Sequence, residues 1–391
     1  MAVDWEKIRK NYFPALRHLT YIMAASASPL NKEAYKKVLW FYNDMLKYGD
    51  IHYDDFNEEL ERLRSIVANY INAKPDEIAF VINTTSGMNI IANSLDNTGE
   101  IIYPSIEFPA SIHSFKRKGF MCKKIFDNNN SYLIENYEKS LSPNTKYVIN
   151  SYVQSLTGFR QNLEEVGNFC QKNNLYHIVN ATQGFSSFEL DVKKQKIDML
   201  VSNGLKWPGC GYGAGILYIK DEFFNENVIP ISGWLSVENA FQLNNENMNI
   251  INKTRSMDGF GGCPNFGALI SLKGCFDLIK NVIGEGDIKK GVTRIQSRIL
   301  WLTSEFLKCI EPLDLKIITP LSIGNRSGII TIEHQNCSKI YDIFIKNKIY
   351  VTPKRYPEDK EDKLLRFAFN YYNNLKDIKK VEKLLKALNI Q

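Results

Sequence analysis

Lys206 is the residue in this sequence whose position best fits covalent chemistry. It follows a predicted strand, Met199 to Ser202, and precedes a loop with glycine at positions 209, 211, 213 and 215. Lysine side chains are normally solvated, whereas this one is predicted to lie at the carboxyl end of a strand beside backbone that must turn tightly. A lysine held in this way is a candidate nucleophile or Schiff-base former.

A second segment combines hydroxyl groups with a predicted helix start. The strand predicted over Ile78 to Ile82 is followed by Asn83-Thr84-Thr85-Ser86-Gly87 and then by a helix-compatible stretch. The three hydroxyls, together with the free backbone N–H groups of a helix N-terminus, suit a phosphate. A capped helix without a ligand explains the same pattern, so the segment alone leaves both interpretations open.

Short apolar runs alternate with polar or amphipathic stretches between about residues 77 and 220. The predicted strands are Ile78 to Ile82, Glu100 to Tyr103, Lys146 to Tyr152, Tyr176 to Val179, Met199 to Ser202 and Ala214 to Ile219. Continuous apolar strands separated by helices are typical of a mostly parallel, doubly wound sheet that is covered on both faces. The sequence therefore predicts an α/β fold for this region.

The sequence changes in character after about residue 265. A long helical region is predicted over Phe266 to Ile310, followed by strands at Gly328 to Glu333, Ile349 to Thr352 and Leu364 to Phe369 and by an amphipathic helix with apolar residues from Leu375 to Leu388. A chain of 391 residues exceeds one ordinary domain. We therefore predict an N-terminal arm over residues 1–20, a large domain over residues 21–260 and a smaller α+β C-terminal domain over residues 261–391.

The composition argues against several classes of protein. Hydrophobic residues make up 44% of the chain, and the net charge of +6 is spread along the sequence, which argues against a disordered chain and against a nucleic-acid partner. The 7 cysteines include no CxxC pair and the 5 histidines show no close spacing, so neither a disulfide framework nor a metal site is predicted. A charged N-terminus and the lack of a charge-free span of bilayer length predict a cytoplasmic protein without membrane contact.

The segment from Asn180-Ala-Thr-Gln183 to the glycine-rich loop resembles class V aminotransferases and cysteine desulfurases. These are pyridoxal-5′-phosphate (PLP) enzymes of the aspartate-aminotransferase fold, also called fold type I. The resemblance implies that Lys206 forms the Schiff base to PLP and that Gln183 contacts the phenolic oxygen of the cofactor. Asn180 stands where the family has the aspartate that pairs with the pyridine nitrogen, and Asn203 and Leu205 replace the serine and histidine that flank the lysine.

Further segments match the same family in the same order, from Tyr21 to Tyr372. The turn that contains Thr84, Thr85 and Ser86 is similar to the family's phosphate turn. Glu107-Phe108-Pro109-Ala110 resembles the segment that places a ring over the pyridine face, which makes Phe108 the stacking candidate. A phenylalanine of the core is the alternative for Phe108.

Three more residues fall on family positions near the substrate or the partner subunit. Ser155 lies in the strand and turn over the active site, where cysteine desulfurases carry asparagine. Cys263 replaces the threonine of a turn that reaches the partner subunit's phosphate, which implies a homodimer with shared active sites. Arg366 falls on the arginine that binds the α-carboxylate of an amino-acid substrate, a task that suits its planar fork.

The departures from the family leave several reactions open. An uncharged Asn180 cannot keep the pyridine nitrogen protonated, which disfavours transamination more than elimination or epimerisation. A desulfurase needs a thiolate near residues 349–363, where the chain has no cysteine, and the nearest thiol, Cys337, is expected to be structural. The leading hypothesis is a class V aminotransferase-like PLP enzyme acting on an amino acid. A C–S lyase, cysteine desulfurase-like enzyme or epimerase, a non-catalytic relative, or an asparagine introduced to trap a state are the alternatives.

Overall fold

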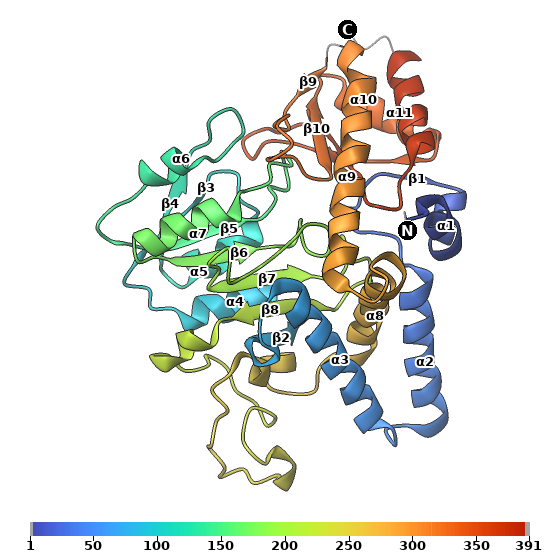
Figure 1. The fold of residues 1–391 in the computed structure, drawn as a ribbon. Coiled ribbons are helices and arrows are strands. Elements are labelled where there is room, and N and C mark those ends of the chain that lie inside the picture. The colour runs from blue at the N-terminus through green and yellow to red at the C-terminus, as the bar shows by residue number, and fades with distance from the viewer. Residues whose placement is uncertain (1–2, 314, 388–391) are drawn as a thin grey trace.

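The computed structural model describes residues 3–313 and 315–387, and a seven-stranded sheet forms its centre (Figure 1). In spatial order the strands are β2 (Ile78–Val81), β8 (Gly215–Ile219), β7 (Met199–Asn203), β6 (Tyr176–Asn180), β5 (Thr145–Ser151), β3 (Glu100–Pro104) and β4 (Met121–Ile125). The strands from β7 to β4 run parallel, whereas β8 is antiparallel to both of its neighbours. The predicted mostly parallel sheet is confirmed.

Helices cover both faces of this sheet. Adjacent residues of a strand point to opposite faces, so two neighbouring residues of β3 show which helices cover each face. Ile101 of β3 packs in one core with α4 (Thr84–Ser94) and α5 (His113–Arg117). Ile102, the next residue, packs in another core with α6 (Ile134–Glu138) and α7 (Leu163–Lys172). On that second face α3 (Tyr53–Ile71) and α8 (Phe266–Asp277) pack against β2, β7 and β8. The doubly wound α/β fold is therefore confirmed.

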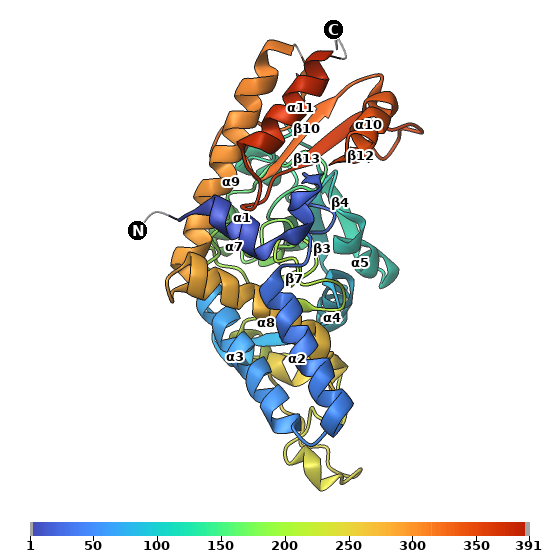
Figure 2. The ribbon, with the colours of Figure 1, turned by 90° about the vertical axis from the view of Figure 1, so that its right-hand side faces the viewer.

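A smaller antiparallel sheet lies at the other end of the molecule (Figure 2). Its strands, in spatial order, are β12 (Thr352–Lys354), β13 (Leu364–Ala368), β10 (Ile329–Glu333) and β9 (Lys316–Ile317). It shares one core with α10 (Cys337–Lys346) and α11 (Leu375–Ala387). The predicted apolar stripe of α11 is buried in this core at Ile378, Val381 and Leu385, while Leu388 lies outside the described residues. The smaller α+β part of the fold is confirmed.

The helix α9 (Ile288–Ile310) links the two parts of the molecule, as both views show. Ile295 and Ile299, in its first half, belong to the core of the large sheet, whereas Phe306 and Ile310 belong to the core of the small sheet. A π-helical turn, Leu278–Ile283, separates α9 from α8. The predicted domain boundary at residue 261 stays a prediction, and the change of core falls within α9.

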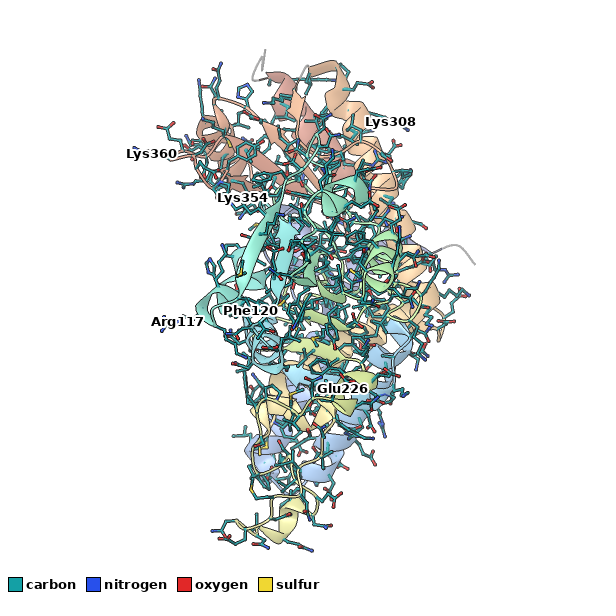
Figure 3. All side chains as sticks on the ribbon, turned by 90° about the vertical axis from the view of Figure 1, so that its left-hand side faces the viewer. Arg117, Phe120, Glu226, Lys308, Lys354 and Lys360 are labelled. Atoms are coloured by element: carbon teal, nitrogen blue, oxygen red, sulfur yellow. The ribbon has the colours of Figure 1, made fainter. Side chains whose placement is uncertain are left out.

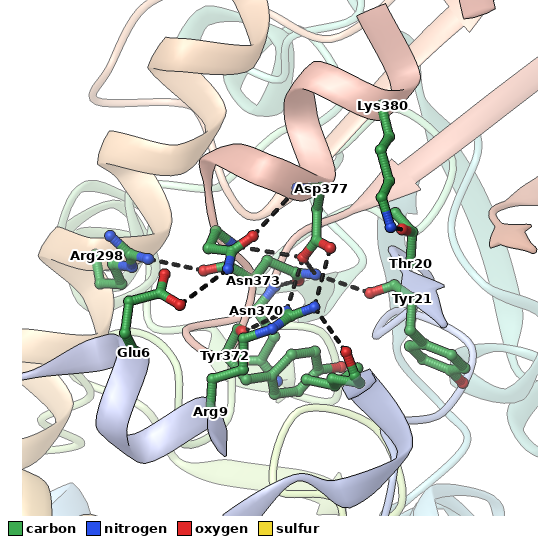
Figure 4. A network of polar contacts seen from close by, with 12 residues as sticks. Glu6, Arg9, Thr20, Tyr21, Arg298, Asn370, Tyr372, Asn373, Asp377 and Lys380 are labelled. Carbon is green, nitrogen blue, oxygen red and sulfur yellow. Dashed lines mark hydrogen bonds and ion pairs between the residues drawn. The ribbon is translucent and has the colours of Figure 1, made fainter. Parts of the chain in front are cut away.

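The N-terminal segment lies against the small sheet and α11. It forms α1 (Trp5–Tyr12) and then β1 (Thr20–Tyr21), which pairs with β11 (Ile349–Tyr350). The next helix, α2 (Lys32–Tyr48), packs against α8 instead. In Figure 4, Arg9 of α1 pairs with the buried Asp377 of α11 at 2.8 Å and donates to the carbonyl of Tyr372. Asn373 donates to the carbonyl of Tyr21 in the same network. These contacts fix the chain just before it enters the large domain.

Within the described part of the chain, no helix combines the length and the apolar character that crossing a membrane requires.

Candidate functional site

A cavity of about 180 Å³ lies where β5, β6 and β7 end, which is the usual ligand position in an open α/β sheet. Most of the predicted site residues line it, although they come from five separate segments. The lining residues are Asn83, Thr84, Thr85, Phe108, Ala110, Ser151, Ser155, Asn180, Thr182, Gln183, Asn203 and Lys206. The fold therefore brings together residues that are up to about 120 positions apart in the chain.

Lys206 enters the cavity from the loop after β7, and its backbone position is firmly held. The loop turns through positive φ angles of 78°, 84° and 96° at Gly209, Gly211 and Gly213, a conformation that favours glycine. The next residue, Trp207, is 1% exposed and donates from Nε1 to Gln183 Oε1 at 2.8 Å. The tight turn that the sequence predicts beside this lysine is confirmed.

The amine of Lys206 is available for reaction. Among the described residues it has no hydrogen bond and no ion pair, and Nζ lies 5.3 Å from the centroid of the Phe108 ring. Burial, and then the positive charges of Arg366 and Lys354, lower the pKa of Lys206 to about 7. A substantial fraction of the side chain is therefore the neutral, nucleophilic amine near neutral pH.

The start of α4 forms the wall opposite Lys206. Asn83 caps the helix by accepting from the backbone N–H of Ser86. Gly87 allows α4 to approach β7, because a Cβ there would lie 2.8 Å from Val201 Cγ1. The first-turn N–H groups at Thr84 and Thr85 have no intrahelical acceptor, so they form an anion-binding end beside the cavity.

Hydroxyl and amide groups connect this helix start with the ends of β6 and β7. The hydroxyls of Thr84 and Thr182 lie 2.6 Å apart, and Asn203 Nδ2 donates to Thr84 Oγ1 at 3.2 Å. Asn203 Oδ1 is buried and has no partner among the described residues. An unsatisfied buried acceptor at the cavity wall, next to free N–H donors, fits a bound group that carries both acceptor and donor atoms. The residues present therefore fit a phosphate-bearing cofactor.

Asn180 joins a chain of hydrogen bonds that ends on a carboxylate. Its Nδ2 donates to Ser111 Oγ at 2.8 Å, and Ser111 Oγ donates to Glu107 Oε1 at 3.1 Å. Asn180 Oδ1 accepts from the backbone N–H of Thr182 at 3.1 Å. The negative charge that Asn180 lacks is thus present two hydrogen bonds away, on Glu107.

Glu107 is a hub for donors around the cavity. Besides Ser111, it accepts from the backbone N–H of Phe108, from the backbone N–H and the hydroxyl of Ser151, and from Gln154 Nε2. Every one of these groups can donate, which matches the acceptor-only chemistry of a carboxylate. Glu107 therefore holds the segment that carries Phe108 against the end of β5.

Both the oxygen and the nitrogen of the Gln183 amide form hydrogen bonds within the protein. Its Oε1 accepts from Trp207, and its Nε2 donates to the carbonyl of Ala25 at 3.0 Å. One N–H of the amide remains for another acceptor. Its predicted contact with the cofactor stays a prediction that this remaining donor permits.

Phe108 is not a core residue. Its side chain is 42% exposed and lines the cavity next to Lys206. The alternative of a buried packing role is therefore excluded, while stacking on a cofactor ring stays a prediction.

Arg366 of β13 does not line the cavity itself but contacts one of its lining residues, Ser155. Its Nη1 donates to the carbonyl of Ser155 at 2.7 Å and its Nη2 to Ser26 Oγ at 3.0 Å, while Nε is buried without a partner. The residue is 2% exposed, and no carboxylate among the described residues pairs with it. Burial lowers the pKa of Arg366 to about 10. A buried, uncompensated guanidinium with a free N–H is suited to an incoming carboxylate.

Besides Arg366, two predicted residues do not line this cavity, Ser86 and Cys263. The Ser86 hydroxyl donates to the carbonyl of Asn83, so it serves the helix cap. Cys263 is exposed on the turn before α8. Its predicted contact with a partner subunit stays a prediction.

The thiols offer little nucleophilic chemistry near the site. Cys337 is buried at the start of α10, donates to the carbonyl of Leu364, and has its pKa raised to about 11 by burial. The structural role expected for Cys337 is confirmed by this environment.

Sequence reasoning missed Glu107, Ser111, Ser26 and Lys354. Glu107 was part of the segment that placed Phe108, and five donors show its importance only once the chain is folded. Ser26 lies in the matched entry segment from Tyr21 to Leu30, which is the signal that could have found it. Lys354 shares a strand pair with the predicted Arg366, and only the register of β12 on β13 brings them together.

Comparisons with known proteins agree with this geometry. The family model described as aminotransferase class-V matches residues 20–381. A protein of Pyrococcus abyssi named probable cysteine desulfurase is 25% identical over 353 residues, which cover 85% of this chain and 84% of that protein.

Solved structures share the fold at lower identity. The apo structure of a cysteine desulfurase from Thermococcus onnurineus NA1 has a TM-score of 0.87 at 21% identity and covers 99% of this chain and 98% of its own. The cystine C–S lyase C-DES, in complex with its product cysteine persulfide, has a TM-score of 0.84 at 19% identity and covers 95% of this chain and 98% of its own. A C-DES variant with glycine covalently linked to its PLP cofactor has a TM-score of 0.85, also at 19% identity, and covers 96% and 98%.

Proposed function

Because this chain belongs to the class-V aminotransferase family of PLP-dependent enzymes, we propose that Lys206 forms the Schiff base to PLP and that Arg366 binds the α-carboxylate of an amino-acid substrate. One observation carries the proposal. Within the described residues, a lysine whose pKa is lowered and that has no polar partner lies near a buried arginine that has no counter-ion, at the carboxyl ends of the parallel strands.

In this proposal, different residues around the cavity bind different parts of the cofactor. Thr84, Thr85 and Asn203 lie where a phosphate would meet first-turn N–H groups, and Phe108 offers a ring face beside Lys206. Asn180 and Gln183 offer amides to the pyridine and phenolic edges. When bound, PLP supplies an electron sink for charge that develops at the substrate Cα.

Lys206 has two successive tasks in this proposal. As a neutral amine, its Nζ would hold the cofactor through the Schiff base. With the substrate bound, Lys206 Nζ would take the proton from the substrate Cα, and its pKa of about 7 suits a base that works near neutral pH. Arg366 orients the substrate for this step, because a bidentate contact fixes the carboxylate plane.

The reaction that follows depends on Asn180. Class V transamination is the leading proposal, but an amide beside the pyridine nitrogen supplies no charge of its own, and the nearest carboxylate, Glu107, acts only through Ser111. This arrangement favours short-lived carbanions, so a C–S lyase elimination is the second candidate. We do not propose a persulfide-forming desulfurase, because residues 349–363 contain no thiol and Cys337 is buried.

A homodimer is part of the proposal. Exposed apolar side chains lie on and just after α2, and on the segment that extends from the body at the lower end of Figure 1. They include Tyr42, Leu46, Ile51, Phe241, Leu243 and Met248. Apolar surface of this kind typically marks a protein interface, and the nearby Cys263 turn is the segment that the resemblance assigns to a partner subunit.

A cytoplasmic location also remains part of the proposal, supported by the odd number of cysteines and the absence of a CxxC pair.

Borohydride reduction tests the proposal directly. Protein loaded with PLP is expected to lose the Schiff-base absorbance on reduction, and peptide mass spectrometry is expected to find the label on Lys206. Lys206→Ala should abolish both signals, whereas Lys193→Ala, at an exposed lysine of the same domain, should leave them unchanged. A label on any other lysine would overturn the proposal.

A further inference from the structure

A second cation lies close to Arg366 on the same small sheet. Lys354 is the last residue of β12, the edge strand that pairs with β13. Thr352 pairs with Arg366 in this register, and Lys354 pairs with Leu364. In Figure 3, Lys354 lies where the small sheet meets the large domain, whereas Lys360 lies at the outer edge.

The face of β12 that carries Lys354 is the face toward the site. Residues two apart on a strand share a face, so Thr352 and Lys354 point the same way. The Thr352 hydroxyl lies 3.0 Å from Ser26 Oγ, which also accepts from Arg366 Nη2. Lys354 is close enough to Lys206 for its charge to lower the pKa of that amine. Three basic side chains therefore face one space.

In the part of the chain that the structure describes, no carboxylate balances this charge. Among the described residues Lys354 has no ion pair, and its pKa is lowered by burial and by Arg366 despite the attraction of Asp362. Asp362 is itself bound by Arg355, whose Nε lies 2.9 Å from its Oδ1. One substrate carboxylate on Arg366 would leave Lys354 uncompensated, so the space is suited to a second anion.

We propose that Lys354 binds a second anionic group on the substrate side chain while Arg366 binds the α-carboxylate, so that the preferred substrates are acidic α-amino acids. This inference rests on the proposed function, because it assumes that Arg366 receives the α-carboxylate. It makes Lys354 the residue that determines specificity between acidic and neutral side chains, and it applies to carboxylate, sulfinate and phosphate groups alike.

Binding of simple anions to the PLP-loaded enzyme tests the inference without turnover. Calorimetric titration is expected to give about tenfold tighter binding for succinate or glutarate than for butyrate, the size expected for one charge-assisted contact. Lys354→Gln should reduce this preference to about twofold or less and leave butyrate binding unchanged, and Lys354→Arg should retain it. Lys360→Gln, at an exposed lysine close in sequence, is the matched control and should behave like the original chain.

Spectral titration with amino acids identifies the anionic group. Aspartate, glutamate, cysteine sulfinate and phosphoserine are compared with asparagine, glutamine and alanine, and Lys354→Gln should remove the advantage of whichever acidic compound is preferred. Equal affinity for succinate, glutarate and butyrate, or an undiminished preference in Lys354→Gln, would overturn this inference. Either result leaves the borohydride label on Lys206 untouched, whereas loss of that label overturns the proposed function instead.

Discussion

The two sides of the cavity differ in how their polar groups are satisfied. The amide wall, made of Glu107, Ser111, Asn180 and Thr182, consists of short side chains that bond to one another and to strand ends. The cationic wall, made of Arg366 and Lys354, has two positive charges and no carboxylate among the described residues. Satisfied groups stabilise the empty protein, whereas uncompensated charges weaken it and await a ligand. The difference separates residues that build the site from residues that we propose to recognise a substrate.

Arg366→Met breaks the cationic wall and should have the largest effect. With the best amino acid of a panel, kcat/KM is expected to fall about a hundredfold or more, because a charged, nearly dry contact to the carboxylate is lost. The free energy of unfolding should change by less than about 1 kcal/mol, since two lost hydrogen bonds are offset by removal of an unpaired buried charge. Steady-state kinetics and urea unfolding measure the two quantities, with the exposed Arg117→Met as control. A large loss of stability with normal kinetics would contradict the assignment.

Glu107→Gln breaks the amide wall and should affect the free energy of unfolding more strongly than Arg366→Met does. Its new amide nitrogen cannot accept, so some of the five donors lose their partner, and the free energy of unfolding of the apoprotein should fall by about 2 kcal/mol. Urea unfolding measures the loss. Glu138→Gln, on an exposed position of α6, is the control and should change it by less than about 0.5 kcal/mol. Equal stability of the two variants would show that the hub does not hold the wall.

The smallest expected effect is on the pH dependence of PLP addition, which measures how the cationic wall acts on Lys206. Only the neutral amine of Lys206 reacts, so the rate of Schiff-base formation in apoprotein should rise with pH to a plateau, with a midpoint near the pKa of about 7. Removing a positive neighbour raises a lysine pKa, so Arg366→Met and then Lys354→Gln should move the midpoint upward. Stopped-flow absorbance measures the rates. A midpoint close to the ordinary lysine pKa of 10.5 would contradict the effect of burial and of the cationic wall on Lys206, and an unchanged midpoint in both variants would contradict the influence of the wall.

The sequence predicted the parts of this site that depend on local patterns. The strand, Lys206 and the glycine loop are contiguous, and so are the strand and turn at Thr84, so periodicity and glycine spacing predicted these elements. The roles of Lys206 and Thr84 came from the resemblance and stay predictions. The chain from Asn180 through Ser111 to Glu107 joins the ends of two strands that are not adjacent in sequence, and no local pattern encodes it. Arg366 was found by resemblance, but the position of Lys354 beside it depends on the register of an edge strand, which the sequence does not show.

The domain arrangement shows the same limit. A helical region was predicted over Phe266 to Ile310, and its helices are present, but the sequence did not reveal the π-helical turn within it. Nor did it show that α8 packs with α2 and α3, because helix periodicity identifies an apolar face and not its partner.

The segment from Thr20 to Ser28 has a consequence for the synthesis of the protein. Its strand β1 pairs with β11, its Ser26 receives Arg366, and its Ser28 contacts Asn370 and Tyr372, so residues made first depend on residues made more than 300 positions later. Contacts of such sequence separation form late, because the intervening chain must first emerge and close the loop. While the ribosome is still translating, the strands around Lys206 can assemble, but the substrate side of the pocket cannot. A nascent chain therefore acquires its place for the cofactor before it acquires its place for the amino acid.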